Sequence, residues 1–209
     1  MNTDLIAAAI GFGVVLISLT IHEAAHAWTA DRLGDPTARV LGRVSLNPLV
    51  HIDMIGTVLL PIIAAASHLP IIGWAKPVPV SMRNLRDPRR DFMIVAAAGP
   101  ISNLLQAVVA AIVLRGAGAA LQDGAPALGV YVLRLAVEIN LLLAFFNLIP
   151  VPPLDGGNVL LGLLPPRAAA AYAQVRQYGF ILLYALLLTG IASRLIEPPT
   201  IFFERILLP

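Results

Sequence analysis

The sequence predicts an all-α membrane protein, a polytopic helical bundle with about four full spans and one re-entrant hairpin segment. Of its 209 residues, 58% are hydrophobic and only 12% are charged. Soluble domains contain about 45–50% apolar residues, so this composition excludes a soluble single domain. Several uncharged runs are about as long as a bilayer core requires at a rise of about 1.5 Å per helical residue. Residues 1–209 are predicted to form a single membrane-embedded domain.

The apolar runs set the predicted elements in chain order. The first helix extends from about Asp4 into Asp31, because Leu5 to Ile21 is apolar and Gly34-Asp35-Pro36 ends the pattern. The tail, residues 198–209, mixes apolar and charged side chains and is predicted to lie on the membrane surface. Three later runs predict the remaining full spans, namely Phe92 to Leu114, about Val130 to Ile149, and Gly179 to Ile191.

A histidine motif near the end of the first helix carries the strongest chemical signal. In His22-Glu23-Ala24-Ala25-His26 the two imidazoles are four residues apart, so a helix brings them to one face, where they can hold a single zinc ion. Glu23 lies beside them as a general base for water. The alternative is that these groups only satisfy a helix end. Three ionisable groups within five residues of a membrane segment are costly without a function, so we favour the metal site.

Two histidines leave a catalytic zinc site short of one protein ligand. The chain has no Cys, so the third ligand must be His, Asp or Glu. Asp155 is the best candidate, because it follows a run with three prolines, Pro150 to Pro153, and precedes two glycines. Such unwound backbone lets a carboxylate turn inward, although Asp-Gly-Gly by itself is more often an ordinary turn.

Three motifs together resemble the site-2 protease family of intramembrane zinc metalloproteases. They are His22-Glu23-xx-His26, then Gly99-Pro100-Ile101-Ser102-Asn103, and then the stretch from Asn147 to Gly157. The stretches His51 to Thr57 and Gly73 to Val80 are similar to the compact bacterial and archaeal branch that lacks a PDZ domain. The resemblance covers about residues 15–165. Many relatives have a further membrane helix before the histidine motif, where this chain has about twenty residues.

The resemblance implies a fold, a reaction and a set of site residues. His22, His26 and Asp155 would bind one zinc ion, and Glu23 would be the catalytic base. The activity implied is that of a zinc endopeptidase in a prokaryotic cell membrane. It would cleave a peptide bond within or beside a transmembrane segment of a membrane-protein substrate, which is regulated intramembrane proteolysis.

The zinc site constrains the topology. His22, His26 and Asp155 must lie at one depth, so the helices that carry them toward it run in the same direction and an odd number of spans separates them. Phe92 to Leu114 supplies one span, so the apolar stretch Ile52 to Ile72 is predicted to be re-entrant and bent at Pro61. Three cations in residues 32–43 and five in residues 76–90 then lie on one side. The positive-inside rule makes that side cytoplasmic, with the active site near it.

Three further polar residues are candidate substrate or oxyanion contacts. Asn103 and Asn147 are amides in apolar helices, where they either hydrogen-bond between helices or orient a substrate. His51 either contacts metal or substrate or caps its loop. A different class of function, a metal-binding membrane protein or transporter without hydrolysis, also fits the ligand set. It would be expected to show internal repeats or several intramembrane acidic residues, and the sequence has neither. The net charge of +2 gives no indication of nucleic-acid binding.

Overall fold

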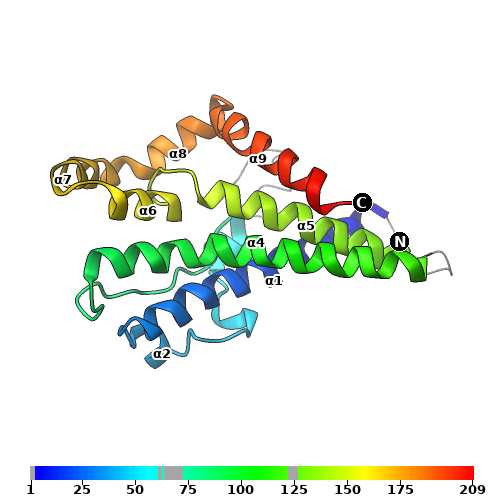
Figure 1. Ribbon diagram of the computed structural model, residues 1–209, viewed down its shortest axis with the longest axis horizontal. Helices are drawn as coiled ribbons and strands as arrows, with labels where there is room; N and C mark the ends of the chain where they lie inside the picture. Colours follow the sequence, from blue (N-terminus) through cyan, green and yellow to red (C-terminus); the bar gives the residue numbers. More distant parts are fainter. Residues whose placement is uncertain (1–2, 61–62, 64–72, 122–126) are drawn as a thin grey trace.

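The computed structural model describes residues 3–60, 63, 73–121 and 127–209, and these ranges contain helices and no β-strand (Figure 1). Its three long helices are α1 (Thr3–Arg32), α4 (Pro88–Leu121) and α5 (Ala127–Asn147). In Figure 1, α1 and α5 run in one direction and α4 runs in the opposite direction. The two helices that lead to His26 and to Asp155 therefore run in the same direction, as predicted from the sequence.

Shorter helical elements fill the connections between and after the long helices. Before α4 the chain forms α2 (Thr37–Val40), a 3-10 turn at Pro48–Val50 and a π-helical turn at Met54–Leu59. After α5 it forms α6 (Asp155–Leu163), α7 (Pro166–Val175), a 3-10 turn at Arg176–Tyr178, α8 (Gly179–Leu188) and α9 (Ile191–Leu207).

The described helices contain three to four candidate membrane spans. Leu5–Arg32, Pro88–Gly116 and Leu128–Asn147 are each long and apolar enough to cross a bilayer. A bent pair, Pro166–Leu188 with Ile191–Leu207, makes a fourth span if it is counted as one, and its two parts meet at 72°. The bend falls at Gly190, whose φ of 71° is a left-handed conformation that glycine adopts without steric cost. The fold class predicted from the sequence is confirmed.

Two predicted boundaries differ from those observed. The helix expected at Phe92 to Leu114 begins four residues earlier, at Pro88, and continues to Leu121. A helix begins at Gly179 as predicted for the last span, but the candidate span also includes the preceding helix and starts at Pro166. Its first part, Pro166–Val175, contains five alanines, which favour a helix without making the segment apolar enough to stand out as a span.

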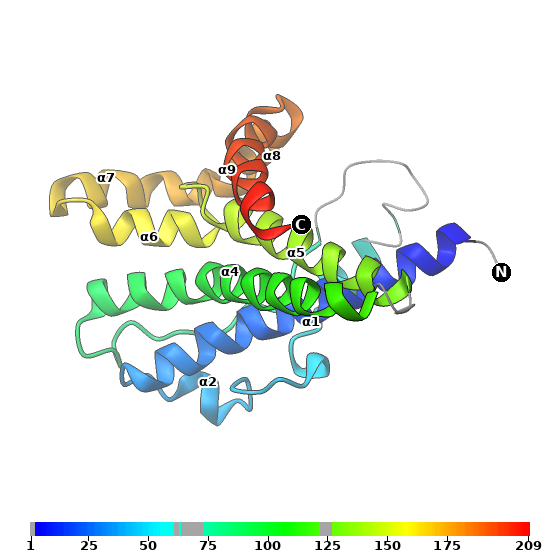
Figure 2. The same cartoon turned by 45° about the vertical axis from the view of Figure 1, so that its right-hand side comes forward.

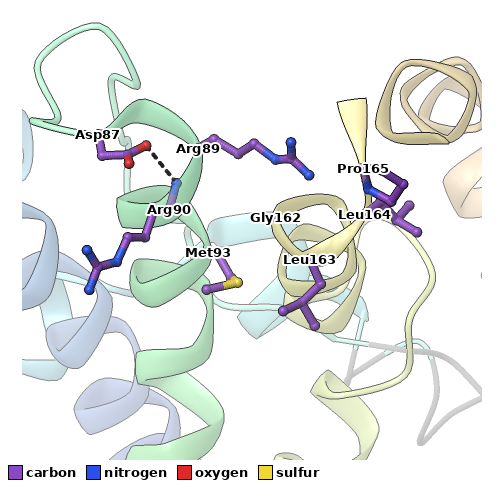
Figure 3. Close-up of a pocket in the computed structure, with 8 residues that line it drawn as sticks. All are labelled: Asp87, Arg89, Arg90, Met93, Gly162, Leu163, Leu164 and Pro165. Carbon is purple, nitrogen blue, oxygen red and sulfur yellow. Dashed lines mark hydrogen bonds between the residues drawn. The ribbon is translucent and has the colours of Figure 1, made fainter. Parts of the chain in front are cut away.

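Helix α4 lies between α1 and α6, an arrangement that both ribbon views show (Figures 1 and 2). Helix α6 approaches α4 closely at Gly162, where a Cβ atom would lie 2.5 Å from the Cβ of Met93. Figure 3 shows these two residues facing each other beside Leu163. The close contact holds α6 against α4 and thereby places Asp155, the first residue of α6, next to the end of α1.

Helix α9 packs back along the bundle. Phe203 and Leu207 contact a buried cluster on α4 and α5 that includes Ala107, Val137 and Leu141. Phe202, which directly precedes Phe203 on α9, is 60% exposed. The tail predicted to lie on the membrane surface is therefore a helix with one face packed on the bundle and one apolar face directed outward.

About half of the predicted re-entrant segment, Ile52 to Ile72, falls outside the described residues, and so does its proposed bend at Pro61. Its two described ends lie side by side. The Trp74 amide donates to the Gly56 carbonyl at 3.2 Å, and the Thr57 hydroxyl donates to the Trp74 carbonyl at 2.8 Å. The chain thus enters and leaves this stretch at one place, as a re-entrant segment requires.

A fully buried carboxylate connects the end of α1 to the segment before α4. Asp35 accepts hydrogen bonds from the Ser81 amide at 2.6 Å and from Asn84 Nδ2 at 2.9 Å. It also accepts from the amide and the hydroxyl of Thr37. Burial alone would raise the pKa of Asp35, but these hydrogen bonds outweigh burial and hold the pKa below its ordinary value.

Candidate active site

Two histidines and one aspartate converge where α1 and α6 meet. His22 and His26 lie one turn apart on α1, and their Nε2 atoms are 3.0 Å apart. The Asp155 Oδ2 atom lies 3.1 Å from His22 Nε2 and 3.4 Å from His26 Nε2. Both histidines are buried. Within the described part of the chain, this is the only group of three such side chains close enough to share a metal ion.

The outer nitrogen of each imidazole has a partner that can accept its proton. His22 Nδ1 lies 2.6 Å from Asn103 Oδ1, and His26 Nδ1 lies 2.6 Å from the Val95 carbonyl oxygen. Each oxygen accepts a hydrogen bond, so each Nδ1 carries the proton and donates it. The two Nε2 lone pairs are then directed toward Asp155.

This donor set fits zinc. Two imidazole nitrogens and a carboxylate oxygen are ordinary ligands of a catalytic zinc site, and ligand atoms at 2.0–2.2 Å in tetrahedral geometry are about 3.3 Å apart. The three separations of 3.0, 3.1 and 3.4 Å bracket that value. Three electron-rich atoms this close repel one another unless a cation or a shared proton lies among them. The residues present therefore suit the metal that the histidine motif predicts.

A glycine on α4 makes room for the cluster. At Gly99 a Cβ atom would lie 2.3 Å from His26 Nε2 and 2.5 Å from His22 Nε2. No side chain larger than hydrogen fits there while the imidazoles keep their positions. Because α4 passes between α1 and α6, this one glycine allows ligands from those two helices to meet.

Glu23 occupies the open side of the cluster. Its Oε2 atom accepts a hydrogen bond from the Val78 amide at 3.2 Å. Val78 belongs to an extended segment, residues 73–80, which we call the strap. The Arg43 guanidinium donates to the carbonyls of Lys76 and Pro77 and holds the strap in place.

The ligands and Glu23 open on a cavity of about 810 Å³. Its walls come from α1, the strap, α4, the α5–α6 turn and α8, and they are mostly apolar. The polar groups among them include Asn147, Asn158 and Arg176. An apolar cavity with a few polar groups suits an apolar polypeptide segment better than a small polar ligand.

The three further candidate residues occupy different environments. Asn147 lines the cavity, and its Nδ2 donates to the Leu143 carbonyl of its own helix. Asn103 and His51 do not line the cavity. Asn103 is fully buried with both ends of its amide bonded, and His51 is buried in its loop with Nε2 2.8 Å from the Ser45 carbonyl. A substrate contact by either of these two side chains therefore has no support from the cavity and stays a prediction.

Comparisons with known proteins identify the family of this chain. The family described as Peptidase family M50 matches residues 125–190, a range that contains Asp155 but not the histidine pair. YwhC of Bacillus subtilis (strain 168), which is named as a zinc metalloprotease, is 37% identical over 88% of this chain and 82% of its own length. The chain belongs to peptidase family M50.

Two Rip2 proteins, also named as zinc metalloproteases, are similar to this chain as well. Rip2 of Mycolicibacterium smegmatis is 33% identical over 86% of this chain, and Rip2 of Mycobacterium tuberculosis (strain H37Rv) is 31% identical over 83% of it. The alignments span 66% and 64% of those two proteins. No solved structure matches the chain. This M50 peptidase is a membrane zinc metalloprotease, as the site-2 protease resemblance implied.

The sequence reasoning missed several residues that surround the site. Ser18 and Asn140 continue the hydrogen bonding behind His22, and the Val78 amide reaches Glu23. Asn140 carried a detectable signal, because an amide in the middle of the apolar run 130–149 is costly unless it is bonded. Ser18 and the Val78 amide carried none, since serine is common in membrane helices and every residue but proline has an amide.

Proposed function

We propose that this protease is an intramembrane endopeptidase that hydrolyses a peptide bond within or beside a transmembrane segment of a membrane-protein substrate. The observation that carries the proposal is the position of Glu23, beside the His22, His26 and Asp155 cluster and on the wall of the apolar cavity. The cavity borders three helices long enough to span a bilayer, so its occupant is expected to arrive from the membrane. This activity would make the protein a component of regulated intramembrane proteolysis.

Each site residue has one role in this proposal. His22 and His26 would bind zinc through Nε2, and Asp155 would bind it through Oδ2. When bound, zinc supplies Lewis acidity that polarises the scissile carbonyl and makes a water molecule more acidic. Glu23 accepts a proton from the attacking water and later donates it to the leaving amine.

The substrate must expose a backbone carbonyl to this site. In a helix each carbonyl accepts a hydrogen bond from the amide four residues later, so the substrate has to unwind locally before it is cut. Helix-breaking residues near the cleavage point would lower that cost. The apolar walls of the cavity favour an unwound apolar segment, whose side chains they can cover.

The metal-transporter alternative has less support. Moving a metal ion across the membrane needs further ligands along a path. Within the described residues the only three-residue ligand group is the one beside Glu23. A base next to a single metal site is the arrangement that hydrolysis needs.

Glu23→Gln tests the proposal most directly. The amide preserves the shape of the side chain but cannot accept a proton, so we expect cleavage of a purified membrane-protein substrate to fall by about 100-fold or more, within the range of general-base catalysis, while bound zinc is unchanged. Glu197→Gln is the matched control, because Glu197 is exposed on α9. Turnover by Glu23→Gln close to that of the control would contradict the proposed role.

We further propose that the site lies near the cytoplasmic face. Residues 32–43 and 76–90, at the end of the bundle that holds the site, contain eight cations, which are retained on the cytoplasmic side during insertion. Because the chain has no Cys, single cysteines report topology cleanly. Cysteines replacing Arg86 and Arg167 should react with an impermeant reagent from the cytoplasmic side, and one replacing Gly116 from the opposite side. Reaction of the first two from opposite sides would contradict the topology.

A further inference from the structure

A buried chain of hydrogen bonds extends from His22 across three helices. His22 Nδ1 lies 2.6 Å from Asn103 Oδ1 on α4, and Asn103 Nδ2 donates to Asn140 Oδ1 on α5 at 2.8 Å. Asn140 Nδ2 then donates to the hydroxyl of Ser18, back on α1, at 2.9 Å. We call Asn103, Asn140 and Ser18 the amide relay. Each of the three is at most 2% exposed, so water does not compete for these bonds.

One backbone carbonyl determines which group donates and which accepts in each hydrogen bond of the relay. Asn140 Nδ2 also donates to the Ala136 carbonyl at 2.9 Å, and a carbonyl oxygen only accepts. The NH2 group of Asn140 must therefore face its own helix, and its Oδ1 must face Asn103. Asn103 in turn has to present its NH2 group to Asn140 and its Oδ1 to His22. His22 Nδ1 is left with an acceptor, so it must carry the proton.

The two histidines thus reach the same tautomer in different ways. His26 Nδ1 meets the Val95 backbone carbonyl directly, and no rotation of a side chain can change that partner. His22 Nδ1 meets a side-chain amide, which would present either an oxygen or an NH2 group if nothing decided between them. A flipped Asn103 would turn a donor toward Nδ1 and favour the proton on Nε2, where it would block metal binding.

We propose that the amide relay is a positioning device for the zinc site, in which Asn140 holds Asn103 in the one orientation that keeps the Nε2 lone pair of His22 free. This inference rests on the proposed role of His22 as a zinc ligand. Groups that orient metal-bound histidines typically contribute about 10- to 100-fold in metal affinity. A role limited to helix packing would require the bonds between α1, α4 and α5 but would leave zinc affinity unchanged.

The relay predicts a graded series of zinc affinities, measured by chelator competition on the purified protein. Asn103→Leu should weaken zinc binding by about 10- to 100-fold and Asn140→Leu by about 10-fold, since the second leaves Asn103 in place but free to flip. Asn140→Asp should restore affinity to within about threefold of wild type, because its carboxyl group still accepts from Asn103.

Thr20→Val is the matched control for loss of a buried polar group. Thr20 is buried on α1 close to Ser18, but its hydroxyl donates only to the Leu16 carbonyl of the same helix at 2.7 Å. The zinc affinity of the Thr20→Val protein should equal that of wild type. Thermal unfolding of the zinc-free proteins separates stability from metal binding. If Asn103→Leu and Asn140→Leu lower the unfolding temperature but leave zinc affinity unchanged, the relay only packs the helices and the inference is overturned.

His22→Ala distinguishes failure of this inference from failure of the proposed function. If His22→Ala retains full zinc affinity, the proposed ligand set is wrong. If it loses zinc while the two leucine variants do not, only the relay is wrong. Should the leucine variants fail to fold, 15N spectra of histidine-labelled, zinc-free wild-type protein still test the inference. They should show a proton on His22 Nδ1, facing Asn103 Oδ1, and a His22 Nδ1 without a proton would overturn the inference.

Discussion

The ligand side and the base side of the active site are built differently. On the ligand side, His22 and His26 are buried, and both are fixed through Nδ1 to partners on α4 at 2.6 Å. On the base side, Glu23 is only partly buried, and among the described residues its side chain has one hydrogen bond, from the Val78 amide at 3.2 Å. Helices enclose the first side, whereas the extended strap borders the second.

The difference indicates which parts of the site must be rigid. A metal site needs its ligands held in one geometry before the metal arrives. The base and the strap face the cavity, where a substrate chain has to enter and leave. The strap is anchored by Gly56 at its start and by Asp35 just beyond its end, with Arg43 between them. Changes on the ligand side should therefore affect zinc binding, and changes on the base side should affect turnover with zinc retained.

The largest effect is expected from Gly99→Ala. The added methyl group would lie 2.3 Å from His26 Nε2 and 2.5 Å from His22 Nε2, so one or both imidazoles must move. A displacement of about 1 Å at a catalytic centre costs on the order of 100-fold in rate, and we expect zinc affinity to fall as well. Metal analysis and peptide-bond cleavage on the purified variant check this.

Gly116→Ala provides the control for the change on α4. Among the described residues, nothing apart from its chain neighbours and the backbone of its own helix lies within 4 Å of the position of its added Cβ atom. Activity and zinc content should match those of wild type, since alanine favours a helix over glycine by up to about 1 kcal/mol. Normal zinc binding by Gly99→Ala would show that the imidazoles can move without losing the metal, and it would contradict the claim that the ligand side must be rigid.

An intermediate effect is expected from Val78→Pro. Proline removes the amide that donates to Glu23, and the strap is already extended between Pro77 and Pro79, which suits a further proline. A hydrogen bond to a charged group contributes about 1.5 kcal/mol or more, so kcat should fall about tenfold. Zinc content should stay at the wild-type value. Val78→Ala keeps the amide and serves as the control. Equal losses in both variants would mean that the side chain matters and the hydrogen bond does not.

The smallest effect on activity is expected from Asp35→Asn, which acts mainly on stability. At pH 7 the loss of the buried carboxylate should lower the free energy of unfolding by about 1–3 kcal/mol. The folded-state pKa of Asp35 lies below the ordinary value of 3.8, so its contribution is present above that pH and is lost as the pH falls through the folded-state pKa. The unfolding free energies of wild type and Asp35→Asn in detergent should therefore begin to converge as the pH falls below about 3.8. A constant difference down to pH 2 would contradict the assignment.

The metal cluster was the most predictable part of the site. The spacing of His22 and His26 specifies one helix face whatever the rest of the fold does, and the proline and glycine pattern around Asp155 specifies a break in a helix. The common direction of the two helices that lead to His26 and Asp155 followed from the requirement that these residues meet. These inferences depend on local geometry and on one distance constraint, so they did not need the tertiary structure.

The surroundings of the cluster were not predictable in the same way. Whether Asn103 faces a substrate or His22 depends on the rotation of α4 about its axis, and apolar residues surround that helix. The contact of Asn140 with Asn103 depends on the register between α4 and α5. The strap meets Glu23 only after folding brings residues 55 positions apart in the chain together. Such contacts are properties of the packed bundle, and a single sequence contains no direct signal of them.

Both ends of the described chain lie at the same end of the bundle (Figure 1). Residues 3 to 22 of α1 alone span about 28 Å at 1.5 Å per residue. The C-terminal residues lie beside Arg115 and Arg134, far along the bundle from Asp155. A fluorescent reporter or affinity handle fused to either end would therefore lie far from His22 and Asp155. In the proposed topology it would also sit in the aqueous compartment opposite to the one nearest the cut, so a released cleavage product and the tagged enzyme could be followed separately.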